Sequence, residues 1–119
     1  MAEYELKYLK REKMAKIKPL AGGEFLYFVV TPKIEDLKLK DLEERIETDI
    51  SNEFIGQNRH EQRYKVSFSG FEKTDDGTNL VLKIEFITKF TINEYDKDSI
   101  IEKTRDEFIE RLNNHLLQF

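Results

Sequence analysis

The chain has 119 residues, of which 37% are charged and 39% hydrophobic, and its formal net charge is −4. The sequence contains no cysteine, which excludes disulfide bonds, thiolate metal sites and a cysteine nucleophile, and fits a reducing compartment such as the cytoplasm. Nine phenylalanines and five tyrosines supply apolar mass for one folded domain over residues 1–119, and no apolar run resembles a signal peptide or a membrane span.

The first segment, residues 3–20, alternates loosely between apolar and charged side chains. Tyr4, Leu6 and Tyr8 fall on one side, which is typical of a strand. The charged cluster at residues 10–13 fits a turn that divides this segment into two strands, and it also fits a bend in one long strand. A helix is the third interpretation, and the sequence leaves all three open.

The second segment follows a pair of glycines. Ala21, Gly22 and Gly23 predict a break, and the apolar run over residues 25–30 predicts a buried strand that stops at Pro32. Successive side chains of a strand point to opposite faces. Alternation therefore divides this strand into an inward set and an outward set, which are Leu26, Phe28 and Val30 against Phe25, Tyr27 and Thr31.

From about Asp36 the spacing of apolar residues becomes helical. One face of the expected helix carries Leu39, Leu42, Ile46, Ile50 and Phe54, with acidic residues elsewhere and Gly56 as a stop signal. After a polar loop, two alternating segments start at Tyr64 and Leu80 and flank the turn residues 74–79. This pattern predicts a long β-hairpin that extends to Ile92.

A last helix is expected to begin near Ser99. Ser99 and Glu102 have the spacing of a capping box, and an apolar stripe follows through Ile101, Phe108, Leu112 and Leu116. Additional apolar residues lie on other sides of this helix, at Ile100, Ile109 and Leu117. This excess predicts a homodimer that forms through the helix or through a sheet edge.

The charges are distributed unevenly between the two kinds of element. The strand-like blocks, residues 1–33 and 63–93, carry net charges of +3 and +1, whereas the helix-like blocks, residues 34–62 and 94–119, carry −5 and −3. Single-stranded nucleic acid is bound by cations that contact phosphates and by aromatic rings on which bases stack. The charge distribution therefore favours a nucleic-acid-binding sheet.

If residues 3–20 form two strands, the element order is three strands, a helix, two strands and a helix. In this order the chain resembles small OB-fold single-stranded DNA-binding proteins of the phage type. The resemblance implies a mainly β fold with two helices, namely a five-stranded barrel plus a C-terminal helix. It also implies non-enzymatic, sequence-tolerant binding of single-stranded DNA, or alternatively RNA, in replication or recombination. The alternative fold is an α+β open antiparallel sheet packed by two helices.

The candidate nucleic-acid-binding residues on this arrangement are Lys10, Arg11, Lys13, Lys16, Lys18, Phe25, Tyr27 and Lys73. The cations at positions 10, 11 and 13 are expected in the loop between the first two strands, and Lys73 is expected beside the hairpin turn. Cations at positions 16 and 18 are expected beside the rings of Phe25 and Tyr27, so that a phosphate and its base are bound together.

Other interpretations of the same residues are open. Phe25 and Tyr27 also fit an ordinary core, and the lysines also fit a guarded strand edge. His60 and His115 have no recognisable catalytic pairing, and no metal site, cofactor or enzyme activity is expected. A protein-interaction module, such as a small inhibitor, adaptor or chaperone-like dimer, is the alternative function. An enzyme built from distant carboxylates is the third.

Overall fold

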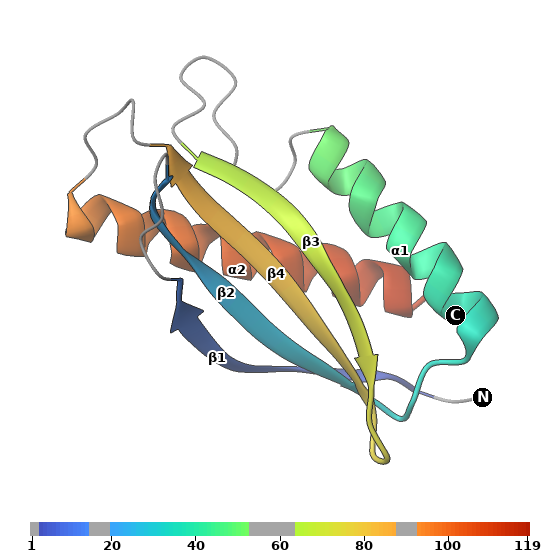
Figure 1. Ribbon diagram of the computed structural model, residues 1–119. Helices are drawn as coiled ribbons and strands as arrows, with labels where there is room; N and C mark the ends of the chain where they lie inside the picture. Colours follow the sequence, from blue (N-terminus) through green and yellow to red (C-terminus); the bar gives the residue numbers. More distant parts are fainter. Residues whose placement is uncertain (1–2, 15–19, 53–63, 88–92) are drawn as a thin grey trace.

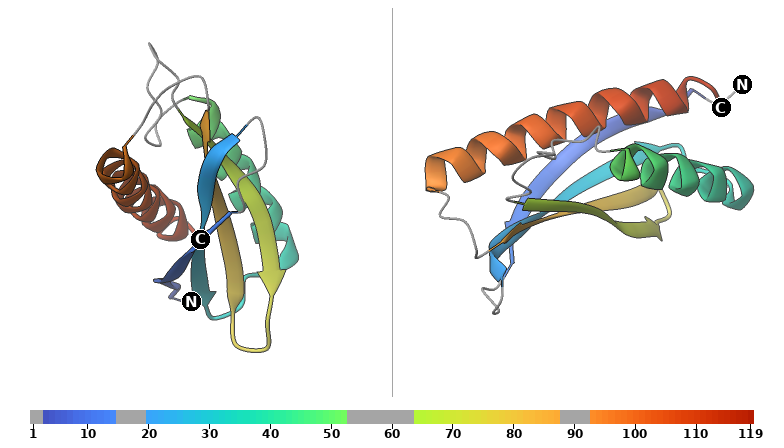
Figure 2. Two further views of the ribbon diagram at one scale, coloured as in Figure 1. Left: turned by 60° about the vertical axis from the view of Figure 1, so that its left-hand side comes forward. Right: turned by 90° about the horizontal axis from the view of Figure 1, so that it is seen from above.

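The computed structural model describes residues 3–14, 20–52, 64–87 and 93–119, which form an antiparallel sheet and two helices (Figure 1). In chain order the elements are β1 (Glu5–Lys13), β2 (Leu20–Thr31), α1 (Asp36–Ser51), β3 (Tyr64–Lys73), β4 (Thr78–Ile87) and α2 (Glu94–Leu116). The strands lie side by side in the order β1-β2-β4-β3, and every neighbouring pair is antiparallel. Both helices lie on the same face of the sheet (Figure 2).

The described residues have the α+β arrangement that was the alternative fold in the sequence analysis. They form four strands in an open sheet, and the five-stranded barrel is not found among them. Residues 10–13 do not turn; they continue β1 and pair with residues 24–27 of β2. The glycine pair does not break the chain either, because Gly22 and Gly23 lie inside β2, where Gly22 adopts a positive φ of 102° beside a register shift. A glycine tolerates that backbone conformation without strain, so the strand continues.

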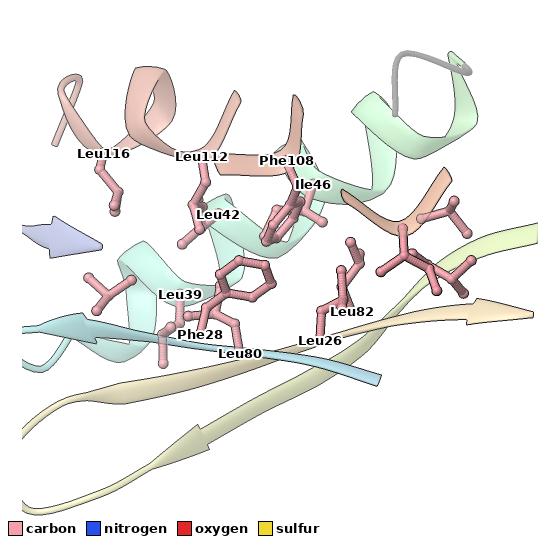
Figure 3. Close-up of a cluster of buried hydrophobic side chains, with 14 of the residues drawn as sticks. Leu26, Phe28, Leu39, Leu42, Ile46, Leu80, Leu82, Phe108, Leu112 and Leu116 are labelled. Carbon is pink, nitrogen blue, oxygen red and sulfur yellow. The ribbon is translucent and has the colours of Figure 1, made fainter. Parts of the chain in front are cut away.

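The core lies between the sheet and the helices. The predicted inward set of β2 is confirmed, since Leu26, Phe28 and Val30 are all fully buried. Phe28 lies at the centre, where its ring centroid is 5.5 Å from that of Tyr8 on β1 and 4.9 Å from that of Phe108 on α2. Figure 3 shows side chains from both helices meeting those of β2 and β4. The labelled members are Leu26, Phe28, Leu39, Leu42, Ile46, Leu80, Leu82, Phe108, Leu112 and Leu116.

The apolar stripes of both helices are confirmed where the structure describes them. In α1, Leu39, Leu42 and Ile46 are buried, whereas Phe54 and Gly56 lie outside the described residues. The predicted hairpin is present as β3 and β4, joined by a turn over residues 74–77, although its last positions, residues 88–92, also lie outside the described part.

The start predicted for the last helix was wrong. α2 begins at Glu94, and Asn93 is its N-cap, with a side-chain oxygen that accepts a hydrogen bond from the backbone N–H of Asp96 at 2.8 Å. An asparagine supplies the same kind of oxygen acceptor as a serine. Ser99 therefore lies inside the helix. The first turn was missed because it is polar and exposed, and carries no apolar periodicity.

The excess of apolar residues on α2 has an explanation within the chain. Ile100 and Ile109 are half-buried and pack against the core, and Leu117, which is 85% exposed, follows the end of the helix. These positions therefore do not form a continuous apolar face along α2. Within the described residues, neither helix has the length and apolarity that crossing a membrane requires.

Thr104 is the polar exception on the buried side of α2. Its side chain is fully buried, and its hydroxyl oxygen has no hydrogen-bond partner among the described residues. A buried hydroxyl without a partner destabilises the folded state by about 1 to 3 kcal/mol. We expect Thr104→Val to raise the free energy of unfolding by about 1 kcal/mol, because valine has the same shape and is β-branched as well. Urea denaturation measures this change.

Thr48→Val provides the matched control. The Thr48 hydroxyl is exposed and donates a hydrogen bond to the carbonyl oxygen of Glu44 at 2.8 Å, so this substitution relieves no buried polar group. We expect it to give no gain in stability. A Thr104→Val protein that is less stable than the wild type would contradict the assignment of an unsatisfied hydroxyl.

Candidate functional site

The face of the sheet opposite the helices is the candidate functional surface, and we call it the open face. The strand registers define its members as the outward residues of β1, β2, β4 and β3. They are Glu5, Lys7, Lys10 and Glu12; Gly23, Phe25, Tyr27, Val29 and Thr31; Asn79, Val81, Lys83 and Glu85; and Lys65, Ser67, Gly70 and Glu72. Neither helix covers this surface (Figure 2).

Apolar side chains occupy the centre of the open face. Phe25, Tyr27 and Val29 follow one another along β2 and are partly exposed, and Val81 lies beside Tyr27 on β4. The ring centroids of Phe25 and Tyr27 are 6.4 Å apart. Two aromatic rings on a central strand are suitable platforms for flat ligands such as nucleic-acid bases.

A lysine lies opposite each of these apolar residues of β2. Lys83 of β4 is the register partner of Phe25, and from β1 Lys10 is the partner of Tyr27 and Lys7 of Val29. The Lys10 Nζ lies 5.1 Å from the centroid of the Tyr27 ring, which is within the range of a cation–π interaction. Phe25, Tyr27 and Val29 form the central row of the open face, and the sheet places a lysine next to each of them.

Carboxylates lie toward the ends of the same strands. The open face carries four glutamates, Glu5, Glu12, Glu72 and Glu85, against four lysines, so the described part of this surface is electrically neutral. Two of the lysines contact these carboxylates, with distances of 3.5 Å for Lys10–Glu12 and 3.2 Å for Lys83–Glu85. Exposed ion pairs contribute about 0 to 1 kcal/mol each, so an incoming anion can replace such a contact at low cost.

Gly70 leaves room for a ligand beside Val81 on this surface. It follows a register shift in β3 between Phe68 and Gly70, has a φ of 128° and is the register partner of Val81. A β-carbon built at this position would have no atom of the described residues within 4 Å, so the space in front of the glycine is open to them. A flat group that lies on Val81 therefore has room to extend over β3.

The structure brings together only some of the sequence-predicted site residues. Lys10, Phe25 and Tyr27 meet on the open face, whereas Lys16 and Lys18 lie outside the described residues. The assignment of Lys10, Arg11 and Lys13 to a loop was wrong, because all three lie within β1.

Three of the predicted cations point to the helix side of the sheet. Arg11 and Lys13 are the register partners of Leu26 and Glu24, which face the helices. Lys73 is the last residue of β3, next to the hairpin turn as predicted, and it forms an ion pair with Asp36 at the start of α1. The parity of a strand decides which of its cations share a face, and these three do not share one with the aromatics.

Sequence reasoning missed one residue of the central row, Val29, and three of the neighbours of this row, which are Lys7, Lys83 and Val81. Lys83 and Val81 carried a usable signal, since they alternate with the buried residues of β4. Their position beside Phe25 and Tyr27, however, depends on β4 pairing with β2. Those strands are separated in the sequence by α1 and β3, and no local pattern indicates their register.

Arg11 belongs to a partly buried ion-pair network that joins the sheet to α2. Its guanidinium lies 3.1 Å from the carboxylate of Glu24 and 2.7 Å from that of Asp98. The Glu24 side chain is only 8% exposed, and burial raises the pKa of its carboxyl group even though Arg11 acts in the opposite direction. This network stabilises the docking of α2 and leaves Arg11 engaged within the chain.

A cavity of about 150 Å³ lies beside this network. Its described lining contains Lys13, Lys97, Glu24, Glu94 and Asp98, together with Met14, Phe86 and two glycines, and no imidazole or hydroxyl group among them. In the described part of the chain, this cavity included, no three histidine or acidic side chains come together in a way that could hold a metal ion. His115 contacts Asp49 at 2.7 Å and so joins α2 to α1.

Comparisons of the chain with protein-family models, with curated proteins and with solved structures find no match. The function must therefore be argued from the open face itself.

Proposed function

We propose that the protein is a non-enzymatic, sequence-tolerant binder of single-stranded nucleic acid, DNA in the first instance, and that the open face is its binding surface. The observation that carries this proposal is the central row, in which each outward apolar residue of β2, namely Phe25, Tyr27 and Val29, has a lysine as a cross-strand partner. Bases stack on Phe25 and Tyr27, while the neighbouring lysines contact the phosphates of the same nucleotides. Rings bind any base through its π face, so this arrangement does not require a particular sequence.

The strand of nucleic acid is expected to run along β2. Phe25 and Tyr27 offer two stacking positions, and Val29 and Val81 extend the apolar surface beyond them. A footprint of about 4 nucleotides, at the low end for a single sheet surface, follows from this short row. The acidic outer surfaces of the helices disfavour wrapping of the strand around the molecule, because they carry the negative blocks of the sequence.

A double helix is not expected to bind at this site. Its bases are stacked on one another, and their π faces are inaccessible to Phe25 and Tyr27. The neutral charge of the open face also gives little attraction for the phosphates of a duplex without the stacking contribution.

The test is fluorescence anisotropy of a labelled oligo-dT with the full chain at several salt concentrations. Three or four phosphate contacts, supplied by Lys7, Lys10, Lys83 and Lys65, predict a slope of log K against log salt of about −2 to −3. Affinity should then fall about 20- to 50-fold between 50 and 200 mM salt. A matching duplex should bind far more weakly, and an absence of binding to the single strand at low salt would refute the proposal.

Lysine substitutions locate the phosphate contacts. Lys10→Ala and Lys83→Ala should each reduce the magnitude of the salt slope by about 0.7, because each removes one contact to a single strand. Lys103→Ala is the matched control, since Lys103 is an exposed lysine on α2, on the other side of the sheet. Equal slopes for all three variants would place the binding surface elsewhere.

A second candidate function is a protein-interaction module that uses the same face. The equal numbers of lysines and glutamates around an apolar centre favour it, because mixed charges suit another protein surface better than a polyanion. Binding of a protein through an apolar centre should change little with salt. The salt titration therefore separates the two candidates.

A further inference from the structure

The charges of the open face are complementary to those of the open face of a second copy placed against it. Lys10 and Glu12 are outward neighbours on β1, and Tyr27 and Phe25 are their respective partners on β2. On β3, Lys65 lies level with Gly23 of β2, and Glu72 lies level with Val29, because Glu85 and Asn79 of β4 link these pairs. A line that crosses the strands between Phe25 and Tyr27 therefore has Lys10 and Glu12 at equal distances on its two sides along β1. Along β3 it has Lys65 and Glu72 at equal distances on its two sides.

A two-fold axis along this line, midway between two facing sheets, superposes opposite charges. It brings Lys10 of one copy over Glu12 of the other, and Lys65 over Glu72, and each contact occurs twice by symmetry. Phe25 then faces Tyr27 of the second copy, while Lys83 faces Val81 and Glu85 faces Asn79. No two like charges of the described open face meet in this arrangement.

We infer that the open face pairs with the open face of a second copy of this chain, forming a weak homodimer in which the nucleic-acid site is covered. Facing sheets pack about 10 Å apart with their strands within about 30° of each other, so the side chains of the central rows can interdigitate. The part of this inference that concerns competition with nucleic acid rests on the proposed function, whereas the dimer itself does not.

The size of the face agrees with a weak association. The four strands are about 4.8 Å apart and have nine residues in β1, twelve in β2 and ten each in β3 and β4, so at about 3.3 Å per residue they give a surface of about 600 Å² per copy. The pair therefore buries about 1,200 Å², which is at the lower limit of specific interfaces. A dimer of this size dissociates readily, as a ligand that competes for the same face requires.

Sedimentation velocity of the full chain without nucleic acid tests the dimer from micromolar to near-millimolar concentration. We expect a concentration-dependent dimer whose dissociation constant rises about tenfold or more in Lys10→Glu and in Glu12→Lys, because each change places like charges opposite each other twice. Lys103→Glu on the helix side is the matched control and should dimerise as the wild type does.

Mixing the two single variants is the decisive test of the dimer. The Lys10→Glu copy carries carboxylates at positions 10 and 12, and the Glu12→Lys copy carries lysines at both. Each should be monomeric alone, yet their mixture should form a heterodimer within about threefold of the wild-type affinity, since every facing pair is again of opposite sign. Restoration in the mixture cannot come from folding within one chain. A wild-type chain that stays monomeric at near-millimolar concentration, or a mixture that stays monomeric, would overturn the dimer.

Addition of oligo-dT to the wild-type dimer tests the competition. Dissociation into monomers bound to oligonucleotide supports a shared surface, and a dimer that binds the oligonucleotide without dissociating overturns it. If the oligonucleotide does not bind monomer or dimer, the proposed function fails while the dimer is judged on the two preceding results.

Discussion

Replacing Tyr27 by alanine is expected to weaken the binding of single-stranded DNA by about 1 to 3 kcal/mol, or about 5- to 150-fold, which is the contribution of one base stacked on an aromatic ring. Phe25→Ala should have an effect of the same size. The two rings are 6.4 Å apart and serve neighbouring bases, so the double variant should lose more than either single variant. Anisotropy with labelled oligo-dT measures these losses.

Two controls make this prediction specific to stacking. Tyr27→Phe keeps the ring and should bind within about twofold of the wild type, because the stacking surface is retained. Tyr95→Ala removes a tyrosine that is 81% exposed near the start of α2, away from the open face, and should bind as the wild type does. Unchanged affinity in both Phe25→Ala and Tyr27→Ala, with folding verified by circular dichroism, would rule out the open face as a stacking surface.

Replacing Arg11 by methionine is expected to lower the free energy of unfolding by about 2 kcal/mol at neutral pH. Loss of one partner from a fully buried ion pair costs about 3 to 5 kcal/mol, and this range is reduced here because the Arg11 side chain is 33% exposed. The substitution leaves the carboxylate of Glu24, 8% exposed, without its closest cation. Urea denaturation of the two proteins gives the difference.

The loss should depend on pH in a defined direction. Burial holds the pKa of Glu24 above its ordinary value in the folded state. Its contribution to stability is therefore fully present below that ordinary value and is lost as the pH rises through the raised value. Without Arg11 the pKa of Glu24 rises further, so the cost of Arg11→Met should be largest at neutral pH and should shrink toward a pH of about 4.

A second substitution separates this electrostatic effect from lost packing. Glu24→Gln in the Arg11→Met background removes the buried charge and should recover most of the lost stability at neutral pH. Lys103→Met, a change of the same kind at an exposed position of α2, should be nearly neutral. A loss in Arg11→Met that is the same at both pH values would contradict the role assigned to Glu24.

Much of the fold was predictable because it depends on local periodicity. The two-residue period of a strand divided residues 25–30 into two faces, although the all-apolar run left open whether Phe25 and Tyr27 belong to the core, and the spacing of Leu39, Leu42 and Ile46 indicated the buried side of α1. The number of strands at the amino terminus was not predictable in the same way. Charged residues 10–13 fit a turn, a bend in one strand or a helix when read alone, and pairing with β2 keeps them extended.

The candidate site was predictable only in part. Members that are close in the sequence could be predicted to share a face, whereas members that are distant in the sequence could not. Phe25 and Tyr27 lie two residues apart on one strand, so the sequence by itself determined that they share a face. Which cations lie beside them depends on the register of β1 and β4 against β2. Pairing over that distance selected Lys7, Lys10 and Lys83, and directed Arg11 and Lys73 toward carboxylates on the helix side.

The sequence by itself therefore determined the helical stripes, the hairpin and the two faces of each strand, because these properties repeat within a few residues of the chain. The tertiary structure alone decided the strand order β1-β2-β4-β3, the placement of both helices on one face and the composition of the open face. The physical reason is that a strand presents its hydrogen-bonding groups to any partner. The choice among partners is made by the packing of the whole core.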